Sequence, residues 1–232
     1  MTAMPSTQPA QPGQPARSAR PAHPTRAARP GVTVRRYRPA DREALADVCV
    51  RTAHAGGDAT GRYREPEIFP AIFATPYAEL EPDLVFVADD GERAIGYIVG
   101  TADSTRFYAA FRERWLPTVA DRFPAPTPPV HGPDDGLRYL LHHAEEMLVP
   151  EIAAEFPAHL HIDLLPEGQR QGLGRRLMST FVAALRERGV PGLHLSMNPA
   201  NTNARAFYDR IGFTELPRPA GRTGVDYLGL KL

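Results

Sequence analysis

The chain has 232 residues, only one cysteine, and no apolar run as long as a secretory signal or a membrane helix requires. A single cysteine cannot form a disulfide within the chain, which excludes the disulfide scaffolds typical of small secreted proteins. A membrane-spanning helix needs about 20 mostly apolar residues in succession. We therefore expect a soluble, cytoplasmic protein that does not bind membranes.

An excess of charge is also missing, because 27 basic residues balance 27 acidic ones. Residues 1–30 contain seven prolines, four arginines and no acidic residue, so the remainder is slightly acidic. Nucleic-acid-binding proteins usually carry a basic surface, and we expect no nucleic-acid partner. Residues 1–30 have almost nothing to build a core, which predicts a disordered leader. A transit peptide is the alternative, although dense proline opposes its amphipathic helix.

The side chains that bind metals or act as thiol nucleophiles are few and poorly placed. Cys49 lies in an apolar helical stretch, which favours buried packing over a role as a nucleophile. His142 and His143 are adjacent and are followed by Glu145 and Glu146. Neighbouring residues on a helix point about 100° apart, so one of these histidines could join a metal site, but both together could not easily do so. We predict no metal site.

The hydrophobic pattern alternates between the periods of strands and helices. Strands are expected at residues 32–38, 84–88, 94–101, 159–165, 193–197, 212–216 and 225–230. Helices are expected after residue 39, at 68–73, from 173 to about 189 and around 204–211. Residues 104–156 are helical apart from a proline-rich loop at 124–133, and we predict that they form an insertion beside the bound ligand. The order predicts a mixed α/β sheet.

The run Gln169-Arg170-Gln171-Gly172-Leu173-Gly174 connects one expected strand to an expected helix. Its glycines allow a ligand to approach the backbone, and the free N–H groups at a helix start attract anions. A phosphate-binding turn is therefore predicted, with an ordinary tight turn as the alternative. The third glycine of G-x-G-x-x-G is absent, and no Gly-Lys-Ser/Thr sequence occurs, which disfavours dinucleotide and Walker-type loops.

Two motifs together resemble the signatures of the GNAT superfamily of acetyl-CoA-dependent N-acetyltransferases. Gln169, Gly172 and Gly174 match Arg/Gln-x-x-Gly-x-Gly/Ala. Residues Asn201, Ala204, Phe207, Tyr208, Gly212 and Phe213 match Asn-x-x-Ala-x-x-Phe/Leu-Tyr-x-x-x-Gly-Phe. The resemblance covers residues 32–232. It implies an α/β GNAT fold with a mixed, mostly antiparallel central sheet flanked by helices, in a single domain at 31–232.

The resemblance also implies direct attack of an amine on acetyl-CoA in a ternary complex, without a metal. Residues 163–165 would pair with the pantetheine arm, Asn201 would orient it, and Tyr208 would protonate the leaving thiolate. A tyrosine pKa of about 10 suits a proton donor at pH 7. The cofactor-binding residues implied are Leu164, Leu165, Gln169, Arg170, Gln171, Gly172, Leu173, Gly174, Arg175, Asn201 and Tyr208.

The acceptor amine must also lose a proton, so a base is expected near the acetyl group. Asp163, His161 and His159 share one face of the expected strand by alternation. Some members of the superfamily use histidines on this strand, but these two are one residue out of step with them. We name Asp163 first and His161 second. The alternative is that Asp163 bonds a neighbouring loop and that the histidines are solvated at an edge.

A narrower resemblance concerns residues 159–166 and 111–115, which are similar to bacterial relatives of the acetyltransferase-like C-terminal domain of eukaryotic O-GlcNAcases. Those eukaryotic domains lack an intact cofactor loop, whereas this chain retains Gln169, Gly172 and Gly174. The kinship alone indicates no substrate.

The alternative function is a non-catalytic acetyl-CoA-binding sensor or interaction module. The presence of Tyr208 argues against it, and the unassigned base argues for it. The acceptor is expected to be a small-molecule or peptide amine. The closing strand at 225–230 could pair across a dimer, so both a monomer and a homodimer are compatible with the sequence.

Overall fold

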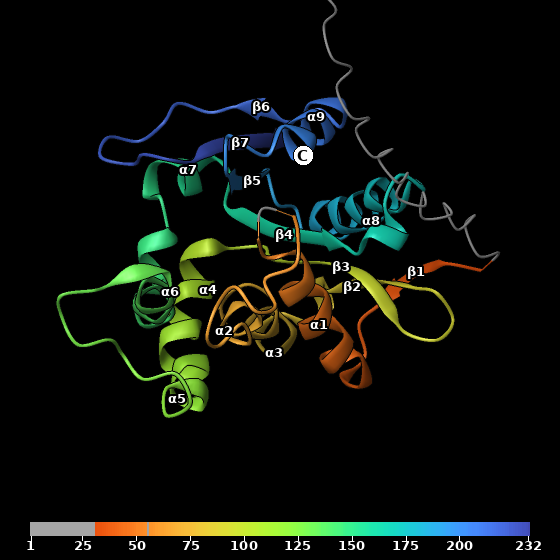
Figure 1. Cartoon of the computed structure of the whole chain (residues 1–232). Helices are drawn as coiled ribbons and strands as arrows, with labels where there is room; N and C mark the ends of the chain where they lie inside the picture. Colours follow the sequence, from red (N-terminus) through yellow and green to blue (C-terminus); the bar gives the residue numbers. More distant parts are fainter. Residues whose placement is uncertain (1–30, 55) are drawn as a thin grey trace, which may run out of the picture.

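A seven-stranded sheet flanked by helices forms the centre of the computed structural model, which describes residues 31–54 and 56–232 (Figure 1). The leader predicted at 1–30 lies outside the described residues. The strands are β1 (Thr33–Arg36), β2 (Phe86–Asp89), β3 (Ala94–Thr101), β4 (Ala158–Leu164), β5 (Gly192–Met197), β6 (Thr214–Glu215) and β7 (Asp226–Lys231). The helices in the described part are α1 (Arg42–Thr52), α2 (Ile68–Phe73), α3 (Thr75–Leu80), α4 (Ser104–Ala110), α5 (Leu116–Val119), α6 (Gly132–His142), α7 (Pro150–Glu155), α8 (Leu173–Glu187) and α9 (Thr202–Arg210).

The strand order is β1-β2-β3-β4-β5-β7-β6. Only β4 and β5 pair in parallel, and the other neighbours are antiparallel. This confirms the mixed, mostly antiparallel sheet. β7 lies between β5 and β6, so Leu228 and Gly229 already have strand partners within the chain on both edges. The sequence pattern does not encode strand order, which depends on long-range pairing.

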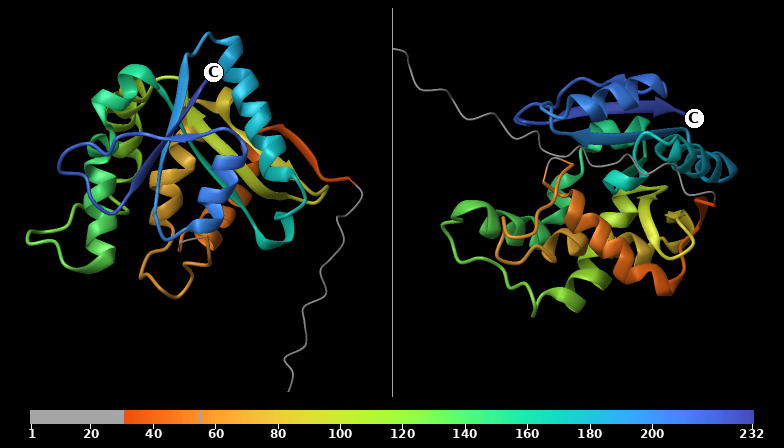
Figure 2. Two further views of the ribbon diagram at one scale, coloured as in Figure 1. Left: turned by 90° about the horizontal axis from the view of Figure 1, so that it is seen from above. Right: turned by 45° about the vertical axis from the view of Figure 1, so that its right-hand side comes forward.

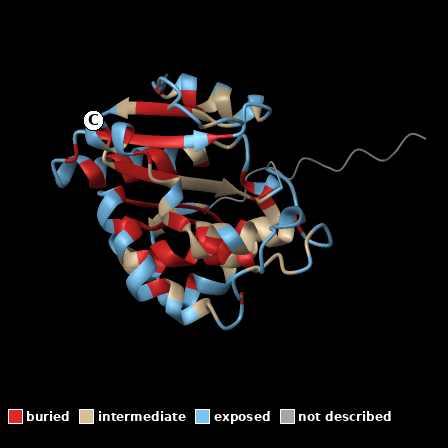
Figure 3. Ribbon diagram, turned by 90° about the vertical axis from the view of Figure 1, so that its left-hand side faces the viewer, coloured by how far each residue is buried: buried red, intermediate tan, exposed pale blue. Residues whose placement is uncertain are grey.

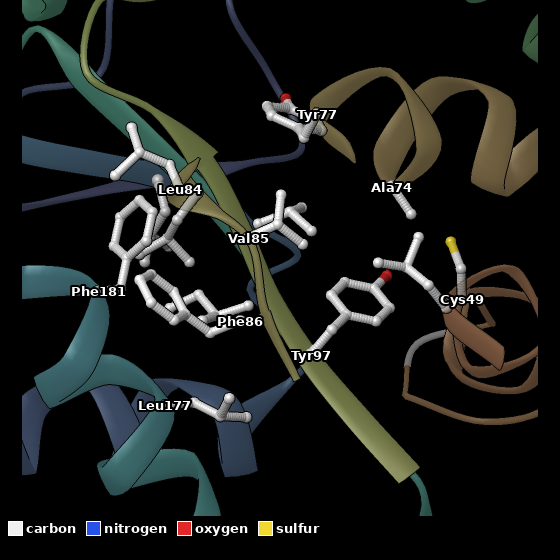
Figure 4. Close-up of a cluster of buried hydrophobic side chains, with 14 of the residues drawn as sticks. Cys49, Ala74, Tyr77, Leu84, Val85, Phe86, Tyr97, Leu177 and Phe181 are labelled. Carbon is white, nitrogen blue, oxygen red and sulfur yellow. The ribbon is translucent and has the colours of Figure 1, made fainter. Parts of the chain in front are cut away.

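Helices cover both faces of the sheet, and the two sides are visible in Figures 2 and 4. Leu177 and Phe181 of α8 pack on one face, and Tyr77 of α3 and Cys49 of α1 lie on the other (Figure 4). All four are almost fully buried. The predicted packing role of Cys49 is thus confirmed, and burial raises the pKa of its thiol. Figure 3 shows the outward helix surfaces as exposed and the strands between them as largely buried.

Two glycines of β3 allow its neighbours to approach closely. A Cβ atom on Gly100 would lie 2.3 Å from the His159 carbonyl oxygen and 2.5 Å from a ring carbon of Phe181. A Cβ on Gly96 would lie 2.3 Å from the Leu164 side chain. Side chains at these positions would push β4 and α8 away, so both glycines set the position of the strand that carries the predicted site.

The helical insertion is present between β3 and β4, from α4 to α7. Helix α3 was not predicted, because its six residues are too few to show a helical period. Its Tyr77 is fully buried and reaches β4, which makes this short helix important for the site. In the part of the chain that the structure describes, no helix is long and apolar enough to cross a membrane.

Candidate functional site

The site begins where the two parallel strands separate. β4 and β5 pair only at Ala158 with Leu193 and at His159 with His194. On its other edge β4 stays paired with β3 as far as Leu164. The N–H of Leu165 donates to β3, and successive residues of a strand point their backbone groups to opposite edges. The backbone groups of Ile162 and Leu164 therefore face the opening between β4 and β5.

This opening leads into a cleft of about 540 Å³, a volume within the usual range of small-molecule sites. Its lining comes from the end of α1 and the segment after it, from β4, from the turn before α8 and from α9. The lining residues are Thr52, Gly56, Ile162, Asp163, Leu164, Gln169, Arg170, Gly172, Gly174, Arg175, Asn201, Asn203, Ala204, Phe207, Tyr208, Arg210 and Ile211.

The glycine turn has the backbone geometry of an anion site. Gly172 caps the start of α8 in the left-handed conformation, with φ 76°. Arg170 has φ 59°, the one positive value found among non-glycine residues of the described chain. Such a conformation costs about 1 kcal/mol and often marks functional loops. The first N–H groups of the 15-residue helix α8 lack helical partners and point outward with the positive end of its dipole.

Two glutamines brace this turn with their side chains. Gln169 Nε2 donates to the Leu164 carbonyl oxygen at 2.9 Å, and Gln171 Nε2 donates to the Glu167 carbonyl oxygen at 2.6 Å. Leu165 and Leu173 are buried in the core and do not line the cleft. Leu165, Gln171 and Leu173 therefore shape the turn without lining the cleft, while Gln169, Arg170, Gly172, Gly174 and Arg175 line the cleft itself.

Three arginines give this end of the cleft a positive charge. Arg170, Arg175 and Arg210 line it, and none of them forms an ion pair within the described residues. Unpaired guanidinium groups beside free backbone N–H groups are suited to phosphate oxygens. Arg210 was not predicted, since it lies in the variable part of the second motif.

Helix α9 supplies the opposite wall. Asn201 Oδ1 accepts a hydrogen bond from the Ala204 N–H at 3.1 Å and so caps the helix. About two turns further along, Tyr208 lines the cleft with its ring packed against Phe207 and Phe213. Its hydroxyl has no hydrogen bond in the described structure, yet no polar side-chain atom there is both buried and unpaired. The hydroxyl therefore opens into the cleft.

Burial, with a further contribution from the charge of Asp163, holds the pKa of Tyr208 above the usual tyrosine range. Tyr208 is consequently protonated at neutral pH and available as a proton donor. This effect requires Asp163 and Tyr208 to lie close together. The predicted proton donor and the first predicted base therefore share one end of the cleft.

Asp163 points to the face of β4 covered by α1, and its partner is a strand rather than a loop. Tyr97 of β3 donates its hydroxyl to Asp163 Oδ2 at 2.6 Å. Burial raises the pKa of Asp163, while hydrogen bonds from Tyr97 and Thr52 partly oppose the shift. The expected bond to a neighbouring loop is not found.

The two histidines of β4 are not solvated at an edge, because β4 lies in the middle of the sheet. His159 is only 5% exposed, and His161 is half-buried beside Phe73. Both ring Nε2 atoms contact the Tyr77 hydroxyl, at 2.7 and 3.1 Å. Burial holds the pKa of His159 well below its usual range and lowers that of His161 to about 4.

Sequence reasoning missed Thr52 and Gly56, which reach the cleft from a segment more than 100 residues before β4. It placed the 104–156 insertion beside the ligand, but no residue of the insertion lines the cleft. Ala204 and Phe207 were visible as motif positions without an assigned contact. Among the described residues, no group of three or more His, Cys, Asp or Glu side chains could hold a metal ion.

We expect Asp163→Asn to stabilise the protein at pH 8. A carboxyl whose pKa is higher in the folded than in the unfolded chain favours folding at low pH and loses that contribution as pH rises through the folded pKa. Asparagine keeps an acceptor for Tyr97 without a charge. The gain in melting temperature should shrink as pH approaches the ordinary Asp pKa of about 4. An equal gain at both pH values would contradict the raised pKa.

Comparison with known proteins agrees with this geometry. The profile of the acetyltransferase (GNAT) family matches residues 137–213. The crystal structure of SsHAT is 58% identical, with a TM-score of 0.83, covering 87% of this chain and 98% of that one. The fold and the site define an acyltransferase. The chain belongs to the GNAT acetyltransferase family.

Curated relatives match more distantly. Rat protein O-GlcNAcase is 23% identical over 190 residues, which are 82% of this chain and 21% of that protein. [Ribosomal protein bS18]-alanine N-acetyltransferase of Escherichia coli strain K12 is 34% identical over 67 residues, 29% of this chain and 45% of that protein. The chain thus matches about a fifth of the first relative's length and under half of the second's. The predicted resemblance to the GNAT superfamily and to O-GlcNAcase is confirmed.

Proposed function

We propose that this protein transfers the acetyl group of acetyl-CoA to a primary amine by direct attack in a ternary complex. The observation that carries the proposal is the Tyr208 hydroxyl, which is unpaired, open to the cleft and kept protonated. It lies in one cleft with the anion-binding turn and the free edge of β4. These three features suit acyl transfer from acetyl-CoA. The turn would bind the pyrophosphate, the backbone of β4 would hydrogen-bond the pantetheine arm, and Tyr208 would donate a proton to the thiolate.

The residues present fit acetyl-CoA along the cleft. The first N–H groups of α8, together with Arg170 and Arg175, would hold the pyrophosphate. The backbone groups of Ile162 and the N–H of Leu164 face this opening and would hydrogen-bond the amides of the pantetheine arm, whereas the Leu164 carbonyl oxygen already accepts from Gln169. The Nδ2 group of Asn201 is left to donate to the arm, because its Oδ1 caps α9.

The amine nitrogen would attack the acetyl carbon, the carbon–sulfur bond would break, and Tyr208 would give its proton to the sulfur. The proton lost by the nitrogen would pass to a group on β4, where Asp163 and His161 point from one face of the strand. Thr52 and Gly56 border the cleft beside Asp163, so the acceptor would enter past the segment after α1. The acceptor class is a small-molecule or peptide amine, and the enzyme acts as a monomer or homodimer.

One apolar core runs from Leu45 to Leu228, which supports the proposal that residues 31–232 act as a single domain. A second, smaller cluster around Tyr227 closes the end formed by α7 and β7. The insertion packs into the main core through residues such as Phe107 and Trp115.

The proposal is tested by incubating the full chain with acetyl-CoA and a panel of amino acids, polyamines, aminosugars and peptides. Released CoA is measured with a thiol reagent, and the acetylated product by mass spectrometry. We expect at least one amine to release CoA well above the background hydrolysis. Tight binding of acetyl-CoA without any turnover across the panel would identify a non-catalytic binding module instead.

Gly172→Ala is expected to weaken acetyl-CoA binding roughly tenfold, which corresponds to about 1.4 kcal/mol. Alanine at φ 76° is strained by about 1–2 kcal/mol, and relief of that strain moves the turn that holds the pyrophosphate. Gly189→Ala is the matched control, since Gly189 has φ 70° with open space around it just beyond the other end of α8. Calorimetry should show weaker binding only for Gly172→Ala. Equal affinities would remove the turn from the binding site.

A further inference from the structure

A hydrogen-bonded chain of four side chains crosses from the start of the insertion to the site strand. Ser104 Oγ, at the start of α4, lies 2.7 Å from His159 Nδ1. His159 Nε2 lies 2.7 Å from the Tyr77 hydroxyl of α3, and that hydroxyl lies 3.1 Å from His161 Nε2. Ser104, His159 and Tyr77 are buried, and Tyr108 stacks on the His159 ring. The acid–base scheme above uses none of these three residues.

The donor and the acceptor of each hydrogen bond in this chain of side chains can be assigned by starting from Ser104. Ser104 Oγ also lies 2.7 Å from the Pro157 carbonyl oxygen, which can only accept, so the single hydroxyl proton of Ser104 points there. Ser104 must then accept from His159 Nδ1–H. His159 is neutral, because burial holds its pKa far below the usual range, so its Nε2 accepts. The Tyr77 hydroxyl therefore donates to His159.

The last link fixes the tautomer of His161. The oxygen of Tyr77 has already given its proton to His159, so it accepts the Nε2–H of His161. With a pKa lowered to about 4, His161 is neutral at physiological pH, and its Nδ1 carries a lone pair. No hydrogen bond to this Nδ1 is found within the described residues, none of which has a buried unpaired side-chain nitrogen. The Nδ1 atom therefore keeps some exposed surface, although His161 itself does not line the cleft and its nearest lining neighbours are Ile162 and Asp163.

Few groups around His161 could accept the proton of the acceptor amine in its place. Phe73 of α2 packs against its ring edge, Val99 of β3 is its strand partner, and Tyr77 occupies its Nε2 side. The titratable groups facing it are Tyr77, His159 and Asp163, two residues along the same face of β4. Asp163 already accepts from Tyr97.

We propose that Ser104, His159 and Tyr77 are positioning residues that hold His161 in the Nε2–H tautomer, so that its Nδ1 lone pair accepts the proton of the acceptor amine. This inference rests on the proposed acetyl transfer and assigns its proton acceptor. In this scheme Asp163 is not the base, and its charge instead helps to raise the pKa of Tyr208 and keep it protonated.

The protons balance in this scheme. A neutral amine forms the nitrogen–carbon bond, and its nitrogen becomes positively charged and strongly acidic. Even a weak base accepts that proton, so a low pKa at His161 Nδ1 is sufficient. The carbon–sulfur bond breaks, and Tyr208 protonates the sulfur. The proton on His161 leaves through the accessible Nδ1, and Tyr208 regains one from solvent. The net result is an amide and a thiol.

The tautomer is tested directly, without turnover, on the full chain labelled with nitrogen-15. Long-range proton–nitrogen spectra should show His161 protonated at Nε2 and His159 at Nδ1. The unprotonated Nδ1 of His161 should persist from pH 8 to about pH 5, consistent with a pKa of about 4. In Tyr77→Phe the fixed Nε2–H signal of His161 should be lost or mixed. A His161 that carries its proton on Nδ1 overturns the proposal.

Kinetics provide the second test. His161→Gln retains a donor amide that reaches towards Tyr77 but lacks the basic nitrogen, so we expect kcat to fall about 10²-fold or more with the KM for acetyl-CoA unchanged. Asp163→Asn should lose less. If the parent acetylates an amine and His161→Gln does so at a similar rate, this inference fails while the proposed function stands. If the parent acetylates none of the amines, the proposed function itself fails.

Discussion

Tyr208→Phe is expected to reduce acetyl transfer about 10²- to 10⁴-fold while acetyl-CoA still binds. The range is that of a lost general acid. The phenyl ring would keep its packing against Phe207 and Phe213, so the cleft should retain its shape. Steady-state kinetics with an identified amine would give the loss in kcat, and calorimetry the affinity for acetyl-CoA.

The control for this variant is Tyr139→Phe, which removes the hydroxyl of an exposed tyrosine that donates to Glu146. It should leave both quantities unchanged. Because the pKa of Tyr208 is raised, the loss of activity from its ionisation should occur only above about pH 10, the ordinary tyrosine pKa. Turnover of Tyr208→Phe within twofold of the parent would exclude Tyr208 as the acid.

Phe181→Ala is expected to have the largest effect on stability, about 3–5 kcal/mol in the free energy of unfolding. Its ring is fully buried and fills the space above Gly100, where it holds α8 against β3 and β4. For a domain of this size the loss corresponds to a fall of roughly 6–20 °C in melting temperature. Thermal unfolding and chemical denaturation should give the same ranking.

Ser179→Ala is the matched control, two residues earlier on the exposed side of the same helix. Substitutions on exposed surfaces usually change stability by less than about 0.5 kcal/mol. A loss below about 1 kcal/mol for Phe181→Ala would mean that α8 does not depend on this contact. The start of α8 would then need another anchor to hold the predicted anion site in place.

Local patterns were sufficient for most individual elements. Leu173, Leu177, Phe181 and Leu185 recur every four residues, and all four are buried on one side of α8. The hairpin of β2 and β3 follows from alternation around Asp89-Asp90-Gly91-Glu92, where Asp89 and Asp90 accept backbone N–H groups of the turn. Helix α3 was missed because six residues with a proline near the start carry too little periodicity.

The candidate site was only partly visible for a related reason. Gly172, Gly174, Asn201 and Tyr208 stand in short motifs whose spacing reflects a turn and a helix, and the structure brings all four to one cleft. Thr52 belongs to no such motif, because its contribution depends on how α1 packs against β4. The histidine chain was equally hidden, since its four members come from α3, α4 and β4.

By itself, the amino-acid sequence determined the alternation of strands and helices, the glycine turn before α8 and the acetyltransferase family, because each depends on residues close together in the chain. Tertiary structure alone decided the position of β7 within the sheet, the separation of β4 from β5 that opens the cleft, and the surroundings of Asp163 and His161. These features arise from pairing and burial between distant segments. A buried pKa or a fixed tautomer depends on the neighbours in space, and the order of residues does not specify them.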